Sequence, residues 1–180
     1  MAPTAIIVPV SEAEPAVELL RRSNTPDGAE GMPPHVTLIY PFTDDSELVA
    51  GRIAEVRAVL EQFAAFEFVL SEVKRFDNLS NESYVWLAPT PDSPFVEMVE
   101  ALVSAFPDHP PFGGAFKTVI PHLTIAASTD QNLLDRVANQ VAEALPITAR
   151  AETACVMKRV GGLWRLGAEF QLASPEERLD

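Results

Sequence analysis

The chain has 180 residues, 47% of them hydrophobic, so it is long enough for one domain with a sizeable core or for two small lobes that share one. Its 13 basic and 26 acidic residues give a formal net charge of −13, which argues against a protein that coats nucleic acid but allows a compact site for one phosphate. No run of about 20 apolar residues could span a bilayer, and the single cysteine cannot form an internal disulfide, so we expect a cytoplasmic monomer without membrane contact.

The chain is predicted to begin with a strand, a helix and a loop. Residues 5–10 are apolar and β-branched, which indicates a strand, and they are too short and lack the basic flank of a signal peptide. Apolar residues then recur at helical spacing at Ala13, Ala16, Val17 and Leu20. Residues 24–34 are rich in proline and glycine, so we predict a loop there.

A strand with an unusual pattern follows this loop, in Pro34-His35-Val36-Thr37-Leu38. Side chains on a strand alternate between two faces, so His35 and Thr37 are predicted to point to the same side. A capped helix comes next, with an apolar stripe at Val49, Ile53, Val56, Leu60 and Phe63. A strand that ends at residues 73–76 and a turn at residues 78–81 complete this part of the chain.

The second part of the chain repeats this order. A strand at residues 84–87 precedes a helix from about residue 92 to 106 and another loop rich in proline and glycine. The segment Pro121-His122-Leu123-Thr124-Ile125 then matches the first histidine frame. After it we predict a capped helix that ends near residue 145, a strand that ends at residue 160, a Gly161-Gly162 turn and a strand around Trp164.

This repeat predicts an α+β fold with two pseudo-symmetric lobes, each an antiparallel sheet backed by two helices, and a cleft between them. We expect the histidine-bearing strands to lie centrally, so that both imidazoles face the cleft. Residues 1–180 are predicted to form a single domain of two intertwined lobes, in which residues 174–180 form a flexible C-terminal tail.

Two imidazoles and two hydroxyls suit an anionic phosphate that needs a proton transfer on each side. One neutral and one protonated imidazole can act as base and acid, because the unperturbed pKa of histidine, about 6.5, lies near working pH. Threonine hydroxyls can donate to the non-bridging oxygens as charge builds on them. We therefore predict His35 and His122 as catalytic residues and Thr37 and Thr124 as phosphate-binding residues; the sequence does not say which histidine is the base.

The motifs His35-Val36-Thr37-Leu38 and His122-Leu123-Thr124-Ile125 resemble the signature of the 2H phosphoesterase superfamily, which contains the 2′-5′ RNA ligases and the cyclic phosphodiesterases. The extension Ile39-Tyr40-Pro41-Phe42 is similar to the RNA-ligase-like branch, and the resemblance covers nearly the whole chain. It implies an enzyme without metal or cofactor that opens the 2′,3′-cyclic phosphate of a nucleotide or RNA end. It also implies that the 3′-oxygen leaves to give a 2′-phosphate, and that a ribose hydroxyl can replace water in a reversible 2′-5′ ligation.

Two other functions stay open at this point. A non-catalytic nucleotide- or RNA-end-binding domain could use the same fold, although binding alone does not require two proton carriers. A metal hydrolase could use His35 and His122 as ligands, but zinc sites commonly have three or four protein ligands, and neither motif has an adjacent carboxylate or cysteine. No metal site is therefore predicted.

Further substrate contacts are hypotheses. The basic residues that could help neutralise a phosphate are Lys117, Arg75, Lys158 and Arg159. For each of them, a solvated strand end or loop position is the favoured alternative. Phe42 and Phe112 could stack on a base, with core packing as the favoured alternative for Phe42. His109 is expected to be a loop residue, and Cys155 a small core residue.

Overall fold

The computed structural model describes residues 3–79, 81–115 and 118–174. The strands are β1 (Ala5–Pro9), β2 (His35–Ile39), β3 (Phe66–Leu79), β4 (Glu82–Thr90), β5 (Leu123–Ser128), β6 (Ile147–Ala151), β7 (Thr153–Val160) and β8 (Leu163–Gln171). The α-helices are α1 (Glu14–Asn24), α2 (Pro26–Ala29), α3 (Ala50–Leu60), α4 (Ser93–Ala105) and α5 (Gln131–Ala142). No helix in this part of the chain is long and apolar enough to cross a membrane. Most of the predicted tail, residues 175–180, lies outside the described residues.

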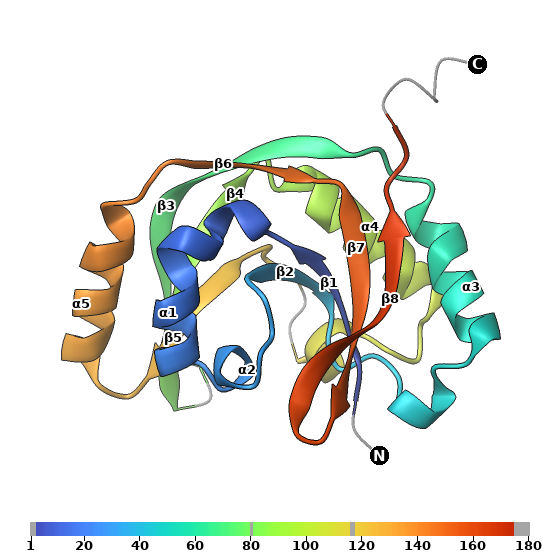
Figure 1. Ribbon diagram of the computed structural model, residues 1–180, viewed down its shortest axis with the longest axis horizontal. Helices are drawn as coiled ribbons and strands as arrows, with labels where there is room; N and C mark the ends of the chain where they lie inside the picture. Colours follow the sequence, from blue (N-terminus) through green and yellow to red (C-terminus); the bar gives the residue numbers. More distant parts are fainter. Residues whose placement is uncertain (1–2, 80, 116–117, 175–180) are drawn as a thin grey trace.

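The strands form two antiparallel sheets of four strands each (Figure 1). The first sheet has the order β2-β1-β7-β8 and joins strands from the two ends of the chain. The second sheet has the order β5-β4-β3-β6 and takes the strands between them. In each sheet the strand of the His-x-Thr-x motif, β2 or β5, pairs with the strand that begins its repeat, β1 or β4. The predicted α+β fold with two antiparallel sheets is confirmed.

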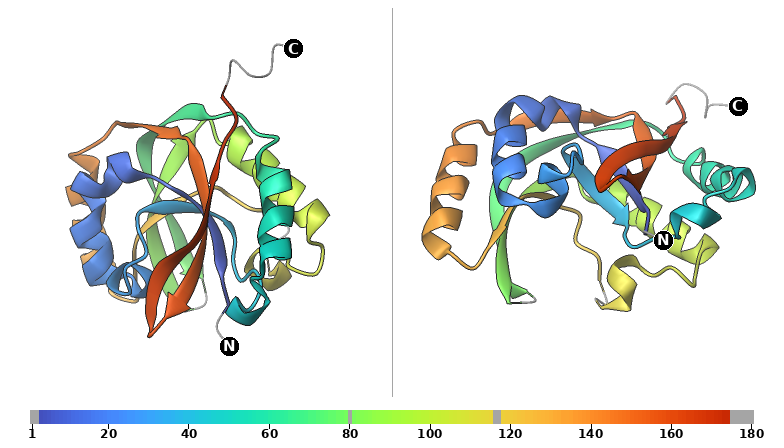
Figure 2. Two further views of the ribbon diagram at one scale, coloured as in Figure 1. Left: turned by 45° about the vertical axis from the view of Figure 1, so that its right-hand side comes forward. Right: turned by 60° about the horizontal axis from the view of Figure 1, so that its bottom comes forward.

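Each sheet is backed by two helices, one of which follows a strand of the other sheet. Helices α1 and α5 pack against β5 of the second sheet, whereas α4 packs against β2 and α3 against β8 of the first sheet. Figure 2 shows the same two helix pairs on opposite sides of the strands. Helix α1 follows β1 of the first sheet but covers the second sheet, and α4 follows β4 of the second sheet but covers the first. Each lobe therefore contains a helix from the other repeat.

Three details differ from the sequence prediction. The strands of the two motifs, β2 and β5, were expected in the centre of their sheets but are edge strands. They contact each other, so they lie where the two sheets meet. Strand β6 was not expected, because its residues Ile147–Ala151 are short and half polar; it is held by pairing with β3. The loop before His35 contains the short helix α2, which Pro26 begins.

Burial of apolar side chains determines where the motif residues point. In β2, Val36 and Leu38 are buried in the core, so His35 and Thr37 lie on the opposite face. Strand β5 has the same alternation and places Thr124 on its open face. A slip of one residue in either strand would bring polar groups into the core, at a cost of roughly 1.5–3 kcal/mol for each apolar side chain exposed.

Candidate active site

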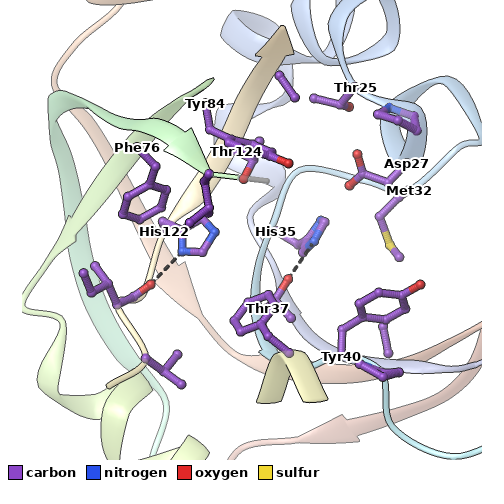
Figure 3. A pocket seen from close by; sticks show the side chains of 18 of the residues that line it. Thr25, Asp27, Met32, His35, Thr37, Tyr40, Phe76, Tyr84, His122 and Thr124 are labelled. Carbon is purple, nitrogen blue, oxygen red and sulfur yellow. Dashed lines mark hydrogen bonds between the residues drawn. The ribbon is translucent and has the colours of Figure 1, made fainter. Parts of the chain in front are cut away.

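A pocket of about 800 Å³ is lined by both histidine-bearing segments (Figure 3). His35, Thr37, His122 and Thr124 all line it, and in Figure 3 the two imidazoles lie near each other, one from each lobe. His122 itself immediately precedes β5. A pocket of this size is large enough for a nucleotide. The structure therefore brings the four motif residues together in one place.

Each imidazole is oriented by a backbone carbonyl two residues before it. The Nδ1 atom of His35 lies 2.7 Å from the carbonyl oxygen of Pro33, and that of His122 lies 2.6 Å from the carbonyl oxygen of Ile120. A carbonyl can only accept, so Nδ1 carries a proton in both rings. The Nε2 atom is then the one that gains or loses a proton. In His35 it lies 3.1 Å from the Thr37 hydroxyl, which can donate to it.

Aromatic rings surround His122. Phe76 and Trp86 meet its ring edge-on at centroid distances of 5.2 and 5.8 Å, and Phe112 stacks on it at 6.4 Å. Burial lowers the pKa of His122, against the opposing effect of the hydrogen bond to the Ile120 carbonyl.

Charged groups surround His35 instead. Burial, together with the positive charge of Arg21, lowers the pKa of His35 from 6.5 to about 4, although Asp27 and the hydrogen bond to Pro33 oppose the shift. A pKa of about 4 leaves His35 neutral near pH 7, so its Nε2 atom can accept a proton.

Arg21 is a buried arginine that joins three segments of the site. It is 1% exposed, and its Nε atom donates to the carbonyl of Thr124 at 2.9 Å. Its two terminal nitrogens donate to the carbonyl of Met32 and to Oδ2 of Asp27, both at 2.9 Å. Sequence reasoning missed Arg21. The signal that could have found it is its position four residues after Val17, which places a charged side chain on the apolar face of the helix.

Helix α2 places Asp27 in the pocket. The Thr25 hydroxyl caps the helix by accepting from the amide of Gly28 at 3.0 Å and donates to the carbonyl of Arg21 at 2.9 Å. A Cβ at Gly28 would lie 2.6 Å from the Arg21 carbonyl oxygen, so only glycine fits. Burial acts to raise the pKa of Asp27, but His35, Arg21 and the hydrogen bonds outweigh it, so that the pKa is lowered and the carboxylate stays ionised.

The two phenylalanine candidates have different positions. Phe112 lines the pocket beside His122, whereas Phe42 is 4% exposed and does not line it. The Phe42 ring packs edge-on against Phe106 and His109, both at 5.2 Å, so the alternative of core packing holds for Phe42. The aromatic residues that line the pocket and that sequence reasoning missed are Tyr40, Phe76, Tyr84 and Trp164.

The basic residues that were candidates for phosphate binding also have different positions. Arg75 pairs at 2.9 Å with Asp135 of α5 and does not line the pocket. Lys158 and Arg159 are neighbours on β7 and therefore point to opposite faces, and only Arg159 lines the pocket. Lys117 lies outside the described residues.

Comparisons with known proteins agree with this architecture. The sequence matches the family model of the 2′-5′ RNA ligase superfamily over residues 9–163. No curated protein matches the chain.

Among solved structures, TT0787 of Thermus thermophilus has a TM-score of 0.65 at 16% identity, over 97% of this chain and 100% of that one. E. coli LigT complexed with 3′-AMP has a TM-score of 0.59 at 14% identity, over 96% and 98%. Kluyveromyces marxianus Usb1 has a TM-score of 0.50 at 13% identity, over 94% and 97%. These likenesses show the fold, and the family model spans both histidine motifs; the chain therefore belongs to the 2′-5′ RNA ligase superfamily.

Proposed function

We propose that this protein is a metal-independent phosphoesterase that opens the 2′,3′-cyclic phosphate of a nucleotide or RNA end to a 2′-phosphate. The observation that carries the proposal is the meeting of two imidazoles in one pocket, each with Nδ1 held by a carbonyl and Nε2 left for proton transfer. The complex of E. coli LigT with 3′-AMP shows that a protein of this fold holds a nucleotide, which supports a substrate of that class.

We assign His35 as the general base and His122 as the general acid. Burial and the positive charge of Arg21 disfavour a proton on His35, so its neutral Nε2 can take the proton from an attacking water. As the new P–O bond forms, the bond from phosphorus to the 3′-oxygen breaks, and Nε2–H of His122 protonates that oxygen. The Thr37 and Thr124 hydroxyls donate to the non-bridging oxygens.

The same groups support ligation. If a ribose 5′-hydroxyl takes the place of water, its proton goes to His35, the 3′-oxygen leaves with a proton from His122, and the product is a 2′-5′ phosphodiester. The reaction needs no nucleoside triphosphate, because the bond from phosphorus to the 3′-oxygen of the cyclic phosphate is exchanged for the new phosphodiester bond.

Turnover of a nucleoside 2′,3′-cyclic phosphate tests the proposal. Phosphorus NMR of the product distinguishes a 2′-phosphate, which we expect, from a 3′-phosphate, which would reverse the assignment of the leaving oxygen. Binding of the cyclic nucleotide without turnover would instead favour the alternative, a non-catalytic nucleotide- or RNA-end-binding domain.

The pH profile of kcat/KM is expected to be bell-shaped with its maximum on the acid side of 6.5. The active form has His35 neutral and His122 protonated. Activity should rise as the pH increases through about 4, where His35 loses its proton, and fall through the pKa of His122, which burial sets below 6.5. Thr37→Val should lower the maximum and keep the outline, because it removes a hydroxyl donor and not a proton carrier. A monotonic rise from acid to alkaline pH on a chemistry-limited substrate would rule out the assignment.

Activity is expected to persist after exhaustive chelation with EDTA. Among the described residues, no group of three or more His, Cys, Asp or Glu side chains could hold a metal ion. The proton transfers proposed above use the two imidazoles alone. Turnover measured before and after dialysis against EDTA checks this point. Loss of activity that zinc or manganese restores would favour the metal-hydrolase alternative.

A further inference from the structure

Arg159 is a cation on the β7–β8 hairpin that lines the same pocket as the two histidines. It belongs to the face of β7 that carries the apolar residues Cys155 and Met157, and it lies opposite Trp164 in the β7–β8 hairpin. Its guanidinium carbon lies 5.0 Å from the centre of the Trp164 ring. Stacking on an indole holds the planar guanidinium in one orientation and leaves its edge available for hydrogen bonds.

The guanidinium of Arg159 is paired with Glu30. Its carboxylate accepts a hydrogen bond from Nη2 of Arg159, and its backbone carbonyl accepts from the amide of Trp164 at 2.9 Å. The Arg159 and Glu30 side chains are 36% and 32% exposed, so the pair lies at the water-accessible rim. An ion pair that is about one third exposed contributes little to folding, and an incoming anion can therefore take the place of the carboxylate.

The pocket is continuous from the histidines to Arg159. Met32, Tyr40 and Trp164 line it together with Arg159, and the rings of Tyr40 and Trp164 meet edge-on at 6.2 Å. Among the described residues that line the pocket, Arg159 and Asp27 carry full charges, and Asp27 is already paired with Arg21. In a chain with a net charge of −13, a local cation is needed wherever a second anionic group is to be held.

We propose that Arg159 forms a second anion subsite, which holds a phosphate group one nucleoside away from the reacting cyclic phosphate. This inference rests on the proposed function and names its substrate class: a cyclic-phosphate nucleotide that carries a further phosphate, either a 5′-monoester or the next phosphodiester of an RNA chain. The incoming phosphate replaces the Glu30 carboxylate on the guanidinium. Glu30 thus acts as an internal anion that neutralises Arg159 when no substrate is bound.

A comparison of three kinds of substrate tests the subsite. The reference is a nucleoside 2′,3′-cyclic phosphate, and the others are its 5′-phosphorylated form and a dinucleotide that ends in the same cyclic phosphate. We expect the wild type to favour at least one phosphate-bearing substrate over the reference by about tenfold in kcat/KM, the scale of one charge-assisted hydrogen bond. A dinucleotide with a neutral methylphosphonate linkage separates the charge of the diester from contacts of the added nucleoside. Equal kcat/KM values for all substrates would overturn the subsite.

Variants identify the residue responsible. Arg159→Met should bring the preference close to one, and Glu30→Gln should increase it, because the competing carboxylate is gone. Arg165→Met is the matched control: Arg165 is exposed on the same hairpin, does not line the pocket, and its loss changes the net charge equally. A preference that survives Arg159→Met unchanged, or that falls equally in Arg165→Met, would contradict the proposal.

Calorimetry separates failure of the subsite from failure of the proposed function. Adenosine 2′,5′-bisphosphate should bind more tightly than adenosine 2′-phosphate to the wild type, and this difference should disappear in Arg159→Met. If no cyclic phosphate is turned over but this binding difference is present, the subsite stands and the proposed chemistry falls. If cyclic phosphates are turned over but the two ligands bind equally, the subsite falls and the chemistry stands.

Discussion

Replacement of His35 or His122 by alanine is expected to lower kcat/KM for a nucleoside 2′,3′-cyclic phosphate by at least about 100-fold, the usual effect of losing a general acid or base. Both side chains face the pocket and not the core, so folding should survive, and circular dichroism and thermal unfolding would check it. His109→Ala is the matched control, because His109 is the remaining histidine and does not line the pocket. Near-normal activity in either motif variant would contradict the two-histidine mechanism.

A substrate with a better leaving group should distinguish the two histidines. In a cyclic phosphate with sulfur in place of the 3′-oxygen, the group that leaves is a thiolate, which needs no proton near neutral pH. His122→Ala should then regain most of the lost activity, because the acid step has become unnecessary. His35→Ala should stay impaired, because water still needs a base. Recovery of the His35 variant instead would reverse the two roles.

Arg21→Met is expected to destabilise the protein by roughly 3 kcal/mol, the lower end for removing one partner of a buried ion pair. Asp27 would be left without its cation while one third of its side chain stays exposed, which limits the loss. The carbonyls of Thr124 and Met32 would lose their donors as well. Because the Thr124 carbonyl belongs to the second motif, kcat should also fall. Urea unfolding followed by tryptophan fluorescence measures the effect.

Arg22 supplies the control for this prediction. It follows Arg21 in α1 and is exposed, so Arg22→Met should change the free energy of unfolding by less than about 0.5 kcal/mol. The double variant Arg21→Met/Asp27→Leu should regain part of the stability, since it removes both members of the pair. If Arg21→Met and Arg22→Met have equal effects, the buried network does not stabilise the fold.

Local sequence patterns predicted the element order and the residues at the centre of the site. Strand alternation places His35 with Thr37 on one face, and helical spacing of apolar residues locates α3, α4 and α5. These periodicities are properties of consecutive residues, so they are visible in the sequence before any packing is known. The His-x-Thr-x motif occurs twice, which indicated that the two strands, although far apart in the chain, occupy equivalent positions in the two lobes. That is why two lobes and two sheets could be predicted.

Only the tertiary structure decided which side chains from separate elements meet. Arg21 has the polarity of a surface residue, yet α1 packs against β5 and buries it beneath the second motif. Arg159 and Lys158 are equivalent basic residues in the sequence, and the pairing of β7 with β8 sends one of them into the pocket. The edge positions of β2 and β5 depend on pairing between strands far apart in the chain. Such contacts follow from the packing of whole elements, which no local periodicity encodes.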